Sequence, residues 1–498
     1  MKLSLQGHDY KYAVEQIMLT LFPDERPEYS DDPGGLTAQS KLTLGRVYAQ
    51  AATVIQKPGL PIGRGIARVR RDRLTEPLET DRLLQRAVKQ SFYKAAAGFI
   101  ETPPEWGSLT GIRPAKIAEG LLAQKSEKAT RSYLTREYFV SPERAKLCVE
   151  TAKASLAVQR TLTERDIALY VGIPFCPTRC AYCSFVSNSV EKSFGLIEPF
   201  VKALLCEIAE MAELVREQEL RVIAVYIGGG TPTALPPDAL DKVLGALREA
   251  FDLSAVCEYT VEAGRPDTIT EQKLETMLRH GVTRTSVNPQ SFSPKVLAAI
   301  GREHMPEDAL EAVELVQRVG AGALSLNMDV IAGLPGDTPE GFRQTLDTVL
   351  SLRPENVTVH TLSLKKGSKI MLEDMRIPSG EAVSDMLRYA YGRLRQCGCG
   401  PYYMYRQKFT SGGFENTGWS IPGHEGIYNI CMMQELCSVL ALGGGGVTKL
   451  VLPNGRIERV FNPKYPREYI MRQEQEQGPS GIDKVRKILT GEEPCHLI

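Results

Sequence analysis

Apolar residues follow two different periods between residues 167 and 362, and the two periods alternate along the chain. Short runs rich in β-branched and aromatic residues stand at 167–173, 222–227, 258–263, 283–288, 325–332 and 357–362. The clearest of the stretches between them has an apolar residue every three or four positions: Leu196, Phe200, Leu204, Ile208 and Met211. Further helices are predicted near 236–250, 270–280, 306–319 and 339–351.

The alternation of strands and helices predicts a parallel sheet, because each crossover between parallel strands needs a helix to bring the chain back. Six such units are too few to close an eight-fold barrel. They suit a partial barrel that is open on one side and has its site at the carboxyl ends of the strands. The sequence therefore predicts an α/β protein whose core, over 166–365, is an open (β/α)6 barrel.

Two further segments flank this core. Residues 1–165 combine an extended run at Lys2–Leu5, a helix near 10–22, a second extended region near 41–56 and a long helix near 79–98. This order predicts a small α+β domain, in which no residue pattern indicates a chemistry. Residues 366–498 contain a helix near 381–396, a glycine-rich middle and a charged tail, and predict an α+β extension.

The composition narrows the class of protein. The 498 residues include 60 Lys and Arg and 60 Asp and Glu, so the formal net charge is zero. Proteins that coat nucleic acid or bind membranes through basic residues need a surplus of positive charge, so neither partner is expected. The arginine-rich stretch at 68–73 is followed directly by acidic residues and is interpreted as a solvated face. With no membrane-spanning apolar stretch and no signal-peptide core, the chain is expected to be soluble and cytoplasmic.

Three of the eleven cysteines are crowded together. Cys176, Cys180 and Cys183 have the spacing C-x3-C-x2-C and directly follow the first predicted core strand. An odd number of cysteines without a secretory signal favours metal or redox use over a disulfide framework. Most of the other eight are expected to be small buried hydrophobic residues.

Two kinds of metal centre suit this triplet. Structural zinc takes four protein ligands, usually from paired C-x2-C knuckles, and no second knuckle is present. A cubane [4Fe–4S] cluster held by three cysteines keeps one iron open for a small molecule. The cluster is favoured, and zinc or simple core packing stay as alternatives.

Polar residues and glycines recur at the ends of the other predicted strands. YIGGGTPT ends the second strand, and its three glycines would let the backbone approach a ligand closely. Glu262, Gln290, Arg302 and Asp329 lie at or just after the following strands. Each residue alone fits a helix cap or a surface group, but together they favour one shared site.

The segment YVGIPFCPTRCAYCSF resembles the radical S-adenosylmethionine superfamily, in which the three-cysteine motif follows a strand and an aromatic residue, here Tyr182, precedes the last cysteine. The resemblance implies the open (β/α)6 barrel and a [4Fe–4S] cluster held by the three cysteines. It further implies that the open iron binds S-adenosylmethionine, which is cleaved to methionine and a 5′-deoxyadenosyl radical that takes a hydrogen from the substrate.

Within that superfamily the core is similar to the oxygen-independent coproporphyrinogen oxidase group, because YVGIPFC, GGGTPT and NMDVIAGLPGD occur in the same order. LTGIRPAK at 109–116 and the stretch 414–450 look like the HemZ-type coproporphyrinogen dehydrogenases, and residues 366–498 like a HemN-type domain that covers the substrate. The resemblance implies that Tyr170, Tyr182, Gly229 and Glu262 help to hold the cluster-bound S-adenosylmethionine. It implies that a second S-adenosylmethionine would contact Gly230, Thr231, Gln290, Arg302 and Asp329.

The chain departs from its relatives in two places. The oxidase branch continues its motif to a fourth cysteine, whereas this chain has Phe185 there. The HemW-type haem chaperones carry an HNxxYW-like motif, and the nearest match here is Glu415, Asn416 and Trp419, without the histidine. The first departure leaves the cluster intact, since three cysteines suffice, and the second weakens a role in haem transfer.

The resemblance implies oxidative decarboxylation of coproporphyrinogen III to protoporphyrinogen IX, with a reductant such as flavodoxin or ferredoxin as partner. A haem-binding chaperone of the HemW type and a radical methyltransferase acting on haem are the alternatives. Lys365 and Lys366 either face the propionates of a porphyrinogen or belong to a solvated loop. His424 is expected at the surface, and the glycines at 443–446 form either a tight loop over the barrel or a flexible turn. No residue is singled out as a catalytic acid or base.

Overall fold

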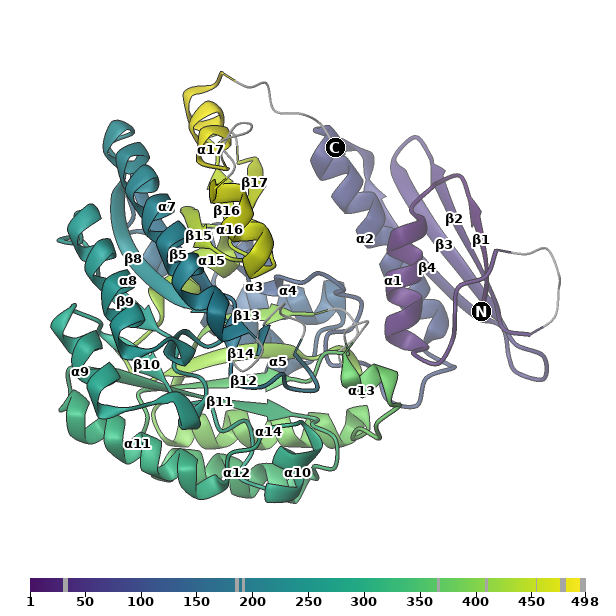
Figure 1. Cartoon of the computed structure of the whole chain (residues 1–498). Coiled ribbons are helices and arrows are strands. Elements are labelled where there is room, and N and C mark those ends of the chain that lie inside the picture. Colours follow the sequence, from purple (N-terminus) through teal and green to yellow (C-terminus); the bar gives the residue numbers. More distant parts are fainter. Residues whose placement is uncertain are drawn as a thin grey trace. The chain divides into compact units, whose positions relative to one another are not determined.

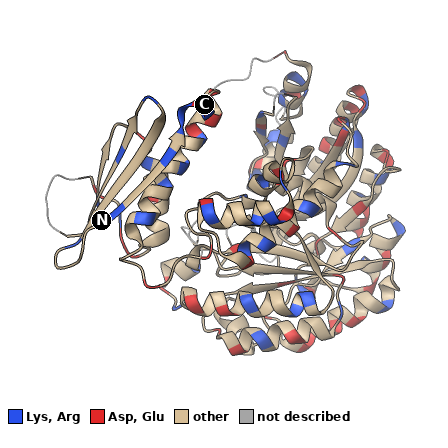
Figure 2. Cartoon of the chain, turned by 180° about the vertical axis from the view of Figure 1, so that it is seen from behind, with Lys and Arg blue, Asp and Glu red and all other residues tan. Residues whose placement is uncertain are grey.

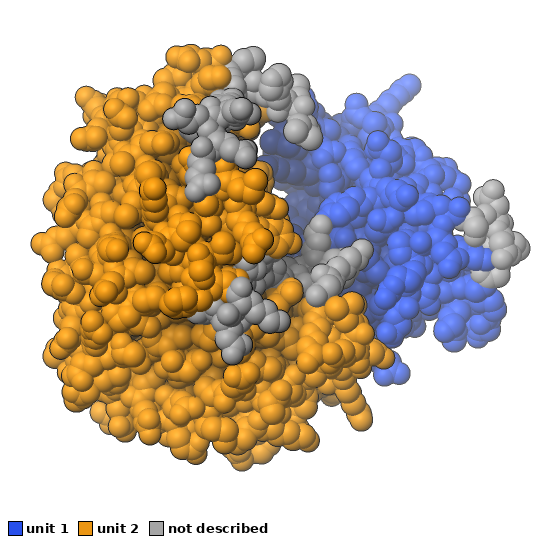
Figure 3. Space-filling model, in the orientation of Figure 1, with its two compact units in different colours: residues 1–149, 412–414 blue, residues 150–411, 415–498 orange. Residues whose placement is uncertain are grey.

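The computed structural model describes residues 1–29, 35–183, 188–189, 193–364, 368–407, 411–453, 455–474 and 481–492. These residues form two compact units, which Figure 3 shows in different colours. Unit 1 comprises residues 1–149 and 412–414, and unit 2 comprises residues 150–411 and 415–498.

A parallel sheet of six strands forms the centre of unit 2 (Figure 1). The strands lie side by side in chain order, and each runs parallel to its neighbours. Their bounds are β5 (Asp166–Ile173), β8 (Arg221–Gly229), β9 (Glu258–Val261), β10 (Arg284–Ser286), β11 (Ser325–Ala332) and β12 (Asn356–Thr361). The six predicted strands and the open barrel are therefore confirmed, since the sheet does not close on itself.

Helices return the chain between these strands and lie on the outer side of the sheet (Figure 1). Phe200, Leu204, Ile208 and Met211 are buried on α7 because they form a single apolar stripe along it. The side chain of Thr338 caps α12 by accepting a hydrogen bond from the Gly341 N–H at 3.1 Å. The returning helices are α7 (Ile197–Glu217), α8 (Pro237–Ala250), α9 (Glu271–Arg279), α10 (Pro294–Ala299), α11 (Pro306–Gly320) and α12 (Pro339–Ser351).

The sheet of unit 2 extends past both edges of the barrel core, to eleven strands. Beside β5 run β15 (Ser438–Gly443), β16 (Val447–Val451) and β17 (Ile457–Phe461), of which β15 is parallel to β5. Beside β12 run β14 (Glu415–Ser420) and β13 (Gly400–Arg406), both in antiparallel pairs. The chain after residue 365 thus adds strands to the same sheet.

Shorter elements complete unit 2. A two-stranded ladder, β6 (Phe175–Cys176) with β7 (Asn188–Ser189), follows β5. The helices outside the barrel repeat are α13 (Lys369–Leu372), α14 (Gly380–Gln396), α15 (Ile427–Gln434), α16 (Pro466–Glu474) and α17 (Gly481–Thr490), and α5 (Pro142–Gln159) spans the boundary between the units.

Unit 1 is a four-stranded sheet with helices packed against it. Its elements are β1 (Lys2–Gln6), α1 (Lys11–Leu21), β2 (Thr37–Leu44), β3 (Tyr48–Gln56), β4 (Gly63–Arg70), α2 (Pro77–Ala96), α3 (Pro114–Leu122) and α4 (Glu127–Tyr138). The extended region predicted near 41–56 comprises the end of β2 and all of β3, which are divided by a turn in which the Gly45 N–H donates to the Tyr48 carbonyl at 2.9 Å. On β4, Arg68 and Arg70 are exposed and alternate with the buried Ala67 and Val69, as the solvated-face interpretation expects.

Charges of both signs are interspersed along the helices of unit 2 (Figure 2). This pattern agrees with the zero net charge of the chain. None of the helices in the described part of the chain has both the length and the apolar character needed to cross a membrane.

A buried carboxylate connects α7 to the end of β15. Glu207 is 3% exposed and accepts hydrogen bonds from the Gly443 N–H at 2.7 Å and from the Tyr469 hydroxyl at 2.6 Å. Its other oxygen accepts from Asn462 Nδ2 at 2.8 Å. Burial raises the pKa of Glu207, and these donors only partly offset the cost of burying it. Gly443, where the glycine-rich segment begins, is therefore held in place by a specific contact.

We expect Glu207→Ala to lower the free energy of unfolding by about 3 kcal/mol, because three buried donors lose their acceptor. Chemical denaturation followed by circular dichroism measures this loss. Glu213→Ala is the matched control, since Glu213 is an exposed carboxylate on the same helix. Equal stability of the two variants would contradict the structural role of Glu207.

Candidate functional site

A cavity of about 570 Å³ opens at the carboxyl ends of the barrel strands. Every residue that the sequence analysis assigned to a cluster or cofactor contact lines this one cavity. These residues are Tyr170, Cys176, Cys180, Tyr182, Cys183, Gly229, Gly230, Thr231, Glu262, Gln290, Arg302 and Asp329. The sheet brings them together because strands that are parallel end at the same edge.

The cysteine loop packs tightly against the end of β8. The N–H groups of Gly230 and Thr231 donate to the carbonyl oxygens of Ile173 and Phe175 at 2.8 and 2.7 Å. A Cβ atom at position 230 would clash with the Phe175 carbonyl and come within 3.0 Å of the Cys176 sulfur. Glycine is needed there because the backbone lies directly against the loop, and the Thr231 hydroxyl then reaches Cys176 Sγ at 3.5 Å.

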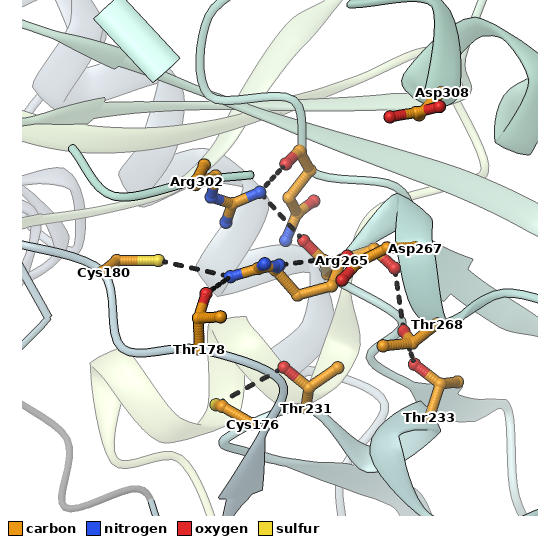
Figure 4. Close-up of polar contacts among 12 residues, drawn as sticks. Cys176, Thr178, Cys180, Thr231, Thr233, Arg265, Asp267, Thr268, Arg302 and Asp308 are labelled. Atoms are coloured by element: carbon orange, nitrogen blue, oxygen red, sulfur yellow. Dashed lines mark hydrogen bonds and ion pairs between the residues drawn. The ribbon is translucent and has the colours of Figure 1, made fainter. Parts of the chain in front are cut away.

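The second cysteine lies beside an arginine that the sequence analysis did not single out. Arg265 follows β9 and is 3% exposed. Its Nη1 donates to the Thr178 hydroxyl at 3.0 Å and to Cys180 Sγ at 3.8 Å, and its Nε donates to the Asp267 carboxylate at 3.2 Å (Figure 4). The loop from Thr178 to Cys180 is thus fastened to the strand end of β9.

The donor set suits an iron–sulfur cluster. None of the described cysteines forms a disulfide, and Cys176, Cys180 and Cys183 all line the cavity. Within the described ranges, no three His, Cys, Asp or Glu side chains converge on one point as ligands of a single metal ion would. A cubane binds each thiolate through a different iron, so its three cysteines need no such convergence.

Glu262 lines the cavity and is held there by a tyrosine. The Tyr226 hydroxyl donates a short hydrogen bond to it, and an added Cβ at Gly228 would lie 3.0 Å from its Oε2. Burial raises the pKa of Glu262 to about 7, and the charge of Asp329 adds to this effect. The carboxyl group therefore titrates near neutral pH.

Asp329 and His360 form a pair across β11 and β12, with His360 Nε2 lying 3.5 Å from Asp329 Oδ2. Burial alone would raise the pKa of Asp329, but the hydrogen bond to His360, the charge of His360 and the hydrogen bonds to Asn327 and Thr358 together lower it. Burial would likewise lower the pKa of His360, but Asp329 raises it above its ordinary value. Asn327 Nδ2 also donates to Asp329, at 2.7 Å.

Gln290 and Arg302 also line the cavity. Gln290 has a φ of +64°, an uncommon value for a residue with a side chain, and its buried Oε1 has no hydrogen-bond partner among the residues that the structure describes. Arg302 Nη1 donates to the Gly264 and Asn288 carbonyls at 3.3 and 2.5 Å, and its Nη2 donates to the Tyr182 hydroxyl at 3.3 Å. Burial raises the pKa of Tyr182, and Arg302 only partly opposes this.

The sequence analysis missed several residues of the cavity wall. Arg265 lies within the VEAGRPDT segment that drew attention to Glu262, and His360 lies in the last core strand, so strand-end position could have indicated both. The aromatic residues give no such signal, because their contacts come from elements far apart in the chain. The missed residues include Tyr226, Arg265, Asn288, His360, Tyr402, Tyr403, Tyr405, Tyr428, Met432 and Met433.

The other residues singled out from the sequence lie partly at the cavity and partly away from it or outside the described residues. Lys365, Lys366 and Phe185 lie outside the described residues. His424 does not line the cavity, and its Nδ1 lies 2.8 Å from the Ser325 hydroxyl. Gly445 lines the cavity, so the glycine-rich segment does reach the site. Asn416 also lines it, and its Oδ1 accepts from the Thr361 N–H at 2.8 Å.

Known proteins are similar to this chain in sequence and in fold. The profile of the Radical SAM superfamily matches residues 170–349. HemZ of Bacillus subtilis strain 168, an oxygen-independent coproporphyrinogen-III oxidase-like protein, is 37% identical over 372 residues, which are 73% of this chain and 74% of HemZ. The heme chaperone HemW of Escherichia coli K12 is 28% identical over 61% of this chain and 75% of its own.

Two coproporphyrinogen oxidases are also similar. The oxygen-independent coproporphyrinogen III oxidase of Paracoccus denitrificans is 30% identical over 51% of this chain and 52% of its own. The structure of the coproporphyrinogen III oxidase HemN from Escherichia coli, a radical SAM enzyme, superposes with a TM-score of 0.52 at 24% identity. It covers 65% of this chain and 73% of HemN, and supports the same fold.

The barrel and its three-cysteine cavity are those of a radical SAM protein, whose cofactors are a [4Fe–4S] cluster and S-adenosylmethionine. Within the superfamily, this chain belongs to the group of oxygen-independent coproporphyrinogen III oxidases and their HemZ and HemW relatives. The family, fold and cofactors predicted from the sequence are confirmed.

The titration of Glu262 predicts a pH-dependent stability of the cofactor-free protein. Its pKa rises from 4.5 to about 7 on folding, so the fold favours the protonated carboxyl group. The stabilisation it gives is complete below about pH 4.5 and is lost as the pH rises through 7. Because Glu262→Gln stays neutral, the wild type should lose about 2 kcal/mol more than this variant between pH 5 and pH 8.

Urea unfolding of both proteins across this pH range measures the difference. Asp329 and His360 titrate in both proteins, so the variant controls for them. Parallel stability curves for the two proteins would show that Glu262 is ionised in the fold throughout this range.

Proposed function

We propose that this chain is an oxygen-independent coproporphyrinogen III dehydrogenase, which converts two propionate side chains of its substrate to vinyl groups and yields protoporphyrinogen IX. The observation that carries the proposal is that one cavity collects all twelve residues assigned to cluster and cofactor contacts. The similarity to HemZ over 73% of this chain supports the same assignment.

Cys176, Cys180 and Cys183 hold the [4Fe–4S] cluster in this proposal. When bound, the reduced cluster supplies the electron that cleaves S-adenosylmethionine to methionine and a 5′-deoxyadenosyl radical. Gly229 offers backbone groups to the amino-acid part of the cofactor. Glu262, which Tyr226 holds in place, accepts hydrogen bonds from the ribose hydroxyls of S-adenosylmethionine.

A second S-adenosylmethionine is proposed to contact Gly230, Thr231, Gln290, Arg302 and Asp329. The buried Oε1 of Gln290 supports a ligand on this side of the cavity, because a buried acceptor without a partner is costly. Asp329 carries a negative charge here, since its pKa is lowered by His360, and it suits an amino group.

The remaining wall of the cavity suits a porphyrinogen. The rings of Tyr226 and Tyr428 stack with centroids 4.3 Å apart, and they present a flat aromatic surface. His360 and Arg284 also line the cavity and supply cations for the substrate's carboxylates. A tetracarboxylate needs such cations inside one pocket, which is compatible with a net charge of zero.

The chemical balance of each conversion requires two partners. One hydrogen atom leaves the β-carbon of a propionate to the deoxyadenosyl radical, and loss of carbon dioxide together with one electron then leaves the vinyl group. A reductant such as flavodoxin or ferredoxin delivers the electron for cofactor cleavage, and a separate acceptor takes the electron from the substrate.

A haem chaperone is the second candidate, and the similarity to HemW over 61% of this chain favours it. In that function the cavity and its tyrosines would bind haem without turnover. The two candidates differ in whether a porphyrinogen is consumed.

We expect Cys176→Ala to prevent cluster assembly, because it removes one of the three ligands. The rate of S-adenosylmethionine cleavage should fall by more than about 100-fold, which is the loss expected when a residue that only supports a metal ligand is removed. Iron and sulfide analysis after anaerobic reconstitution measures the first effect, and release of 5′-deoxyadenosine measures the second. Cys206→Ser is the matched control, because Cys206 is an exposed cysteine of the same unit. Full cluster content in Cys176→Ala would contradict the ligand assignment.

Reconstituted protein should convert coproporphyrinogen III to protoporphyrinogen IX under anaerobic conditions, with S-adenosylmethionine and a reductant present. Mass spectrometry should show the loss of two carboxyl groups and, in addition, of one β-hydrogen from each of the two side chains. Stoichiometric haem binding with an unchanged porphyrinogen would support the chaperone instead. A linear tetrapyrrole formed from haem together with S-adenosylhomocysteine would support the methyltransferase.

A further inference from the structure

Arg265 is a buried cation directly beside a cysteine of the cluster motif. Its Nη1 lies 3.8 Å from Cys180 Sγ and 3.0 Å from the Thr178 hydroxyl (Figure 4). Its side chain is only 4% exposed, so water cannot screen this charge from the sulfur. Thr178 holds the guanidinium in an orientation in which an N–H group faces the thiolate.

The charge of Arg265 is only partly compensated. Asp267 contacts Nε, on the side away from Cys180, and its side chain is 38% exposed and therefore hydrated. The Nη2 group is buried and has no hydrogen-bond partner among the described residues. Arg265 therefore presents a net positive charge and an unused donor to the part of the cavity that contains Cys180.

The backbone around Arg265 is fixed before any ligand binds. The Thr268 N–H and hydroxyl both donate to the Arg265 carbonyl, at 3.0 and 2.8 Å. The Thr268 carbonyl in turn accepts from the buried Lys273 ammonium at 3.0 Å, and the Thr268 hydroxyl lies 2.6 Å from that of Thr233. This network fixes the backbone from which the Arg265 side chain extends to Cys180.

A cation and an N–H donor at a cluster thiolate stabilise the more negative state of the cluster. Reduction adds one electron, so the interaction is stronger in the reduced state and raises the reduction potential. A higher potential makes the cluster easier to reduce for a physiological electron donor.

We propose that Arg265 is a positioning residue that raises the reduction potential of the [4Fe–4S] cluster through its hydrogen bond to Cys180. The inference rests on the cluster ligands of the proposed function, but it does not depend on the substrate.

The potential of the reconstituted full-length protein tests this inference. An electrochemical titration followed by electron paramagnetic resonance measures the reduced fraction of the cluster at each applied potential. In Arg265→Gln the ratio of reduced to oxidised cluster at a fixed potential should fall about tenfold. This corresponds to a decrease of the reduction potential by about 59 mV for a one-electron couple. Arg265→Lys keeps the charge but not the planar fork, so its ratio should fall less.

The variant Asp267→Asn distinguishes an electrostatic effect of Arg265 on the cluster from a loss of rigidity in the loop that carries Cys180. It removes a negative charge next to Arg265, so the ratio of reduced to oxidised cluster should rise above that of the wild type. A merely structural role would move both variants in the same direction. Arg318→Gln is the control, because Arg318 is an exposed arginine that is paired with Glu271 and does not line the cavity.

Iron and sulfide content is measured for every variant. An unchanged potential in fully loaded Arg265→Gln, or equal directions of shift in Arg265→Gln and Asp267→Asn, would overturn the inference. If Arg265→Gln fails to hold a cluster, Asp267→Asn decides: a higher potential supports the inference, and an unchanged or lower one overturns it. A wild type without any cluster would overturn the ligand assignment itself, and the inference with it.

Discussion

The close approach of the end of β8 to the cysteine loop is the constraint on which the site depends. Parallel pairing of β5 with β8 brings Gly230 against the carbonyl of Phe175, where a side chain would clash. Two backbone hydrogen bonds can then form, from Gly230 and Thr231 to the residues just before Cys176. The first cysteine is therefore positioned by backbone contacts, which depend on a glycine rather than on the cysteine itself.

The cavity also has to accommodate several buried charges, and it does so by pairing most of them. Asp329 pairs with His360, and against the cost of burial this pairing contributes to a lowered pKa of Asp329 and a raised pKa of His360. Arg302 is held by two backbone carbonyls. Glu262 accepts a hydrogen bond from the Tyr226 hydroxyl, but burial raises its pKa. The cavity thus combines paired charges with a carboxyl group, that of Glu262, which changes its charge near neutral pH.

Local patterns were sufficient for the barrel core and for the residues at its strand ends. Hydrophobic periodicity located β5, β8, β9, β10, β11 and β12, and the rule that parallel strands end at one edge brought Glu262 and Asp329 to the same cavity as the cysteines. The pairing of β14 with β12 and of β15 with β5 could not be predicted in this way. Such pairings join segments that are far apart in the chain, and no period within either segment encodes the partner.

The sequence by itself determined the alternation of strands and helices, the three-cysteine motif and the glycines beside it, because each is a matter of neighbouring residues and their spacing. Tertiary structure alone decided which charges meet. Arg265 reaches Cys180 from a loop 85 residues away, and the Tyr428 ring, on α15, stacks on Tyr226 of β8. Burial of such groups in one cavity determines their partners and their pKa values, and burial is a property of the packed fold rather than of any segment.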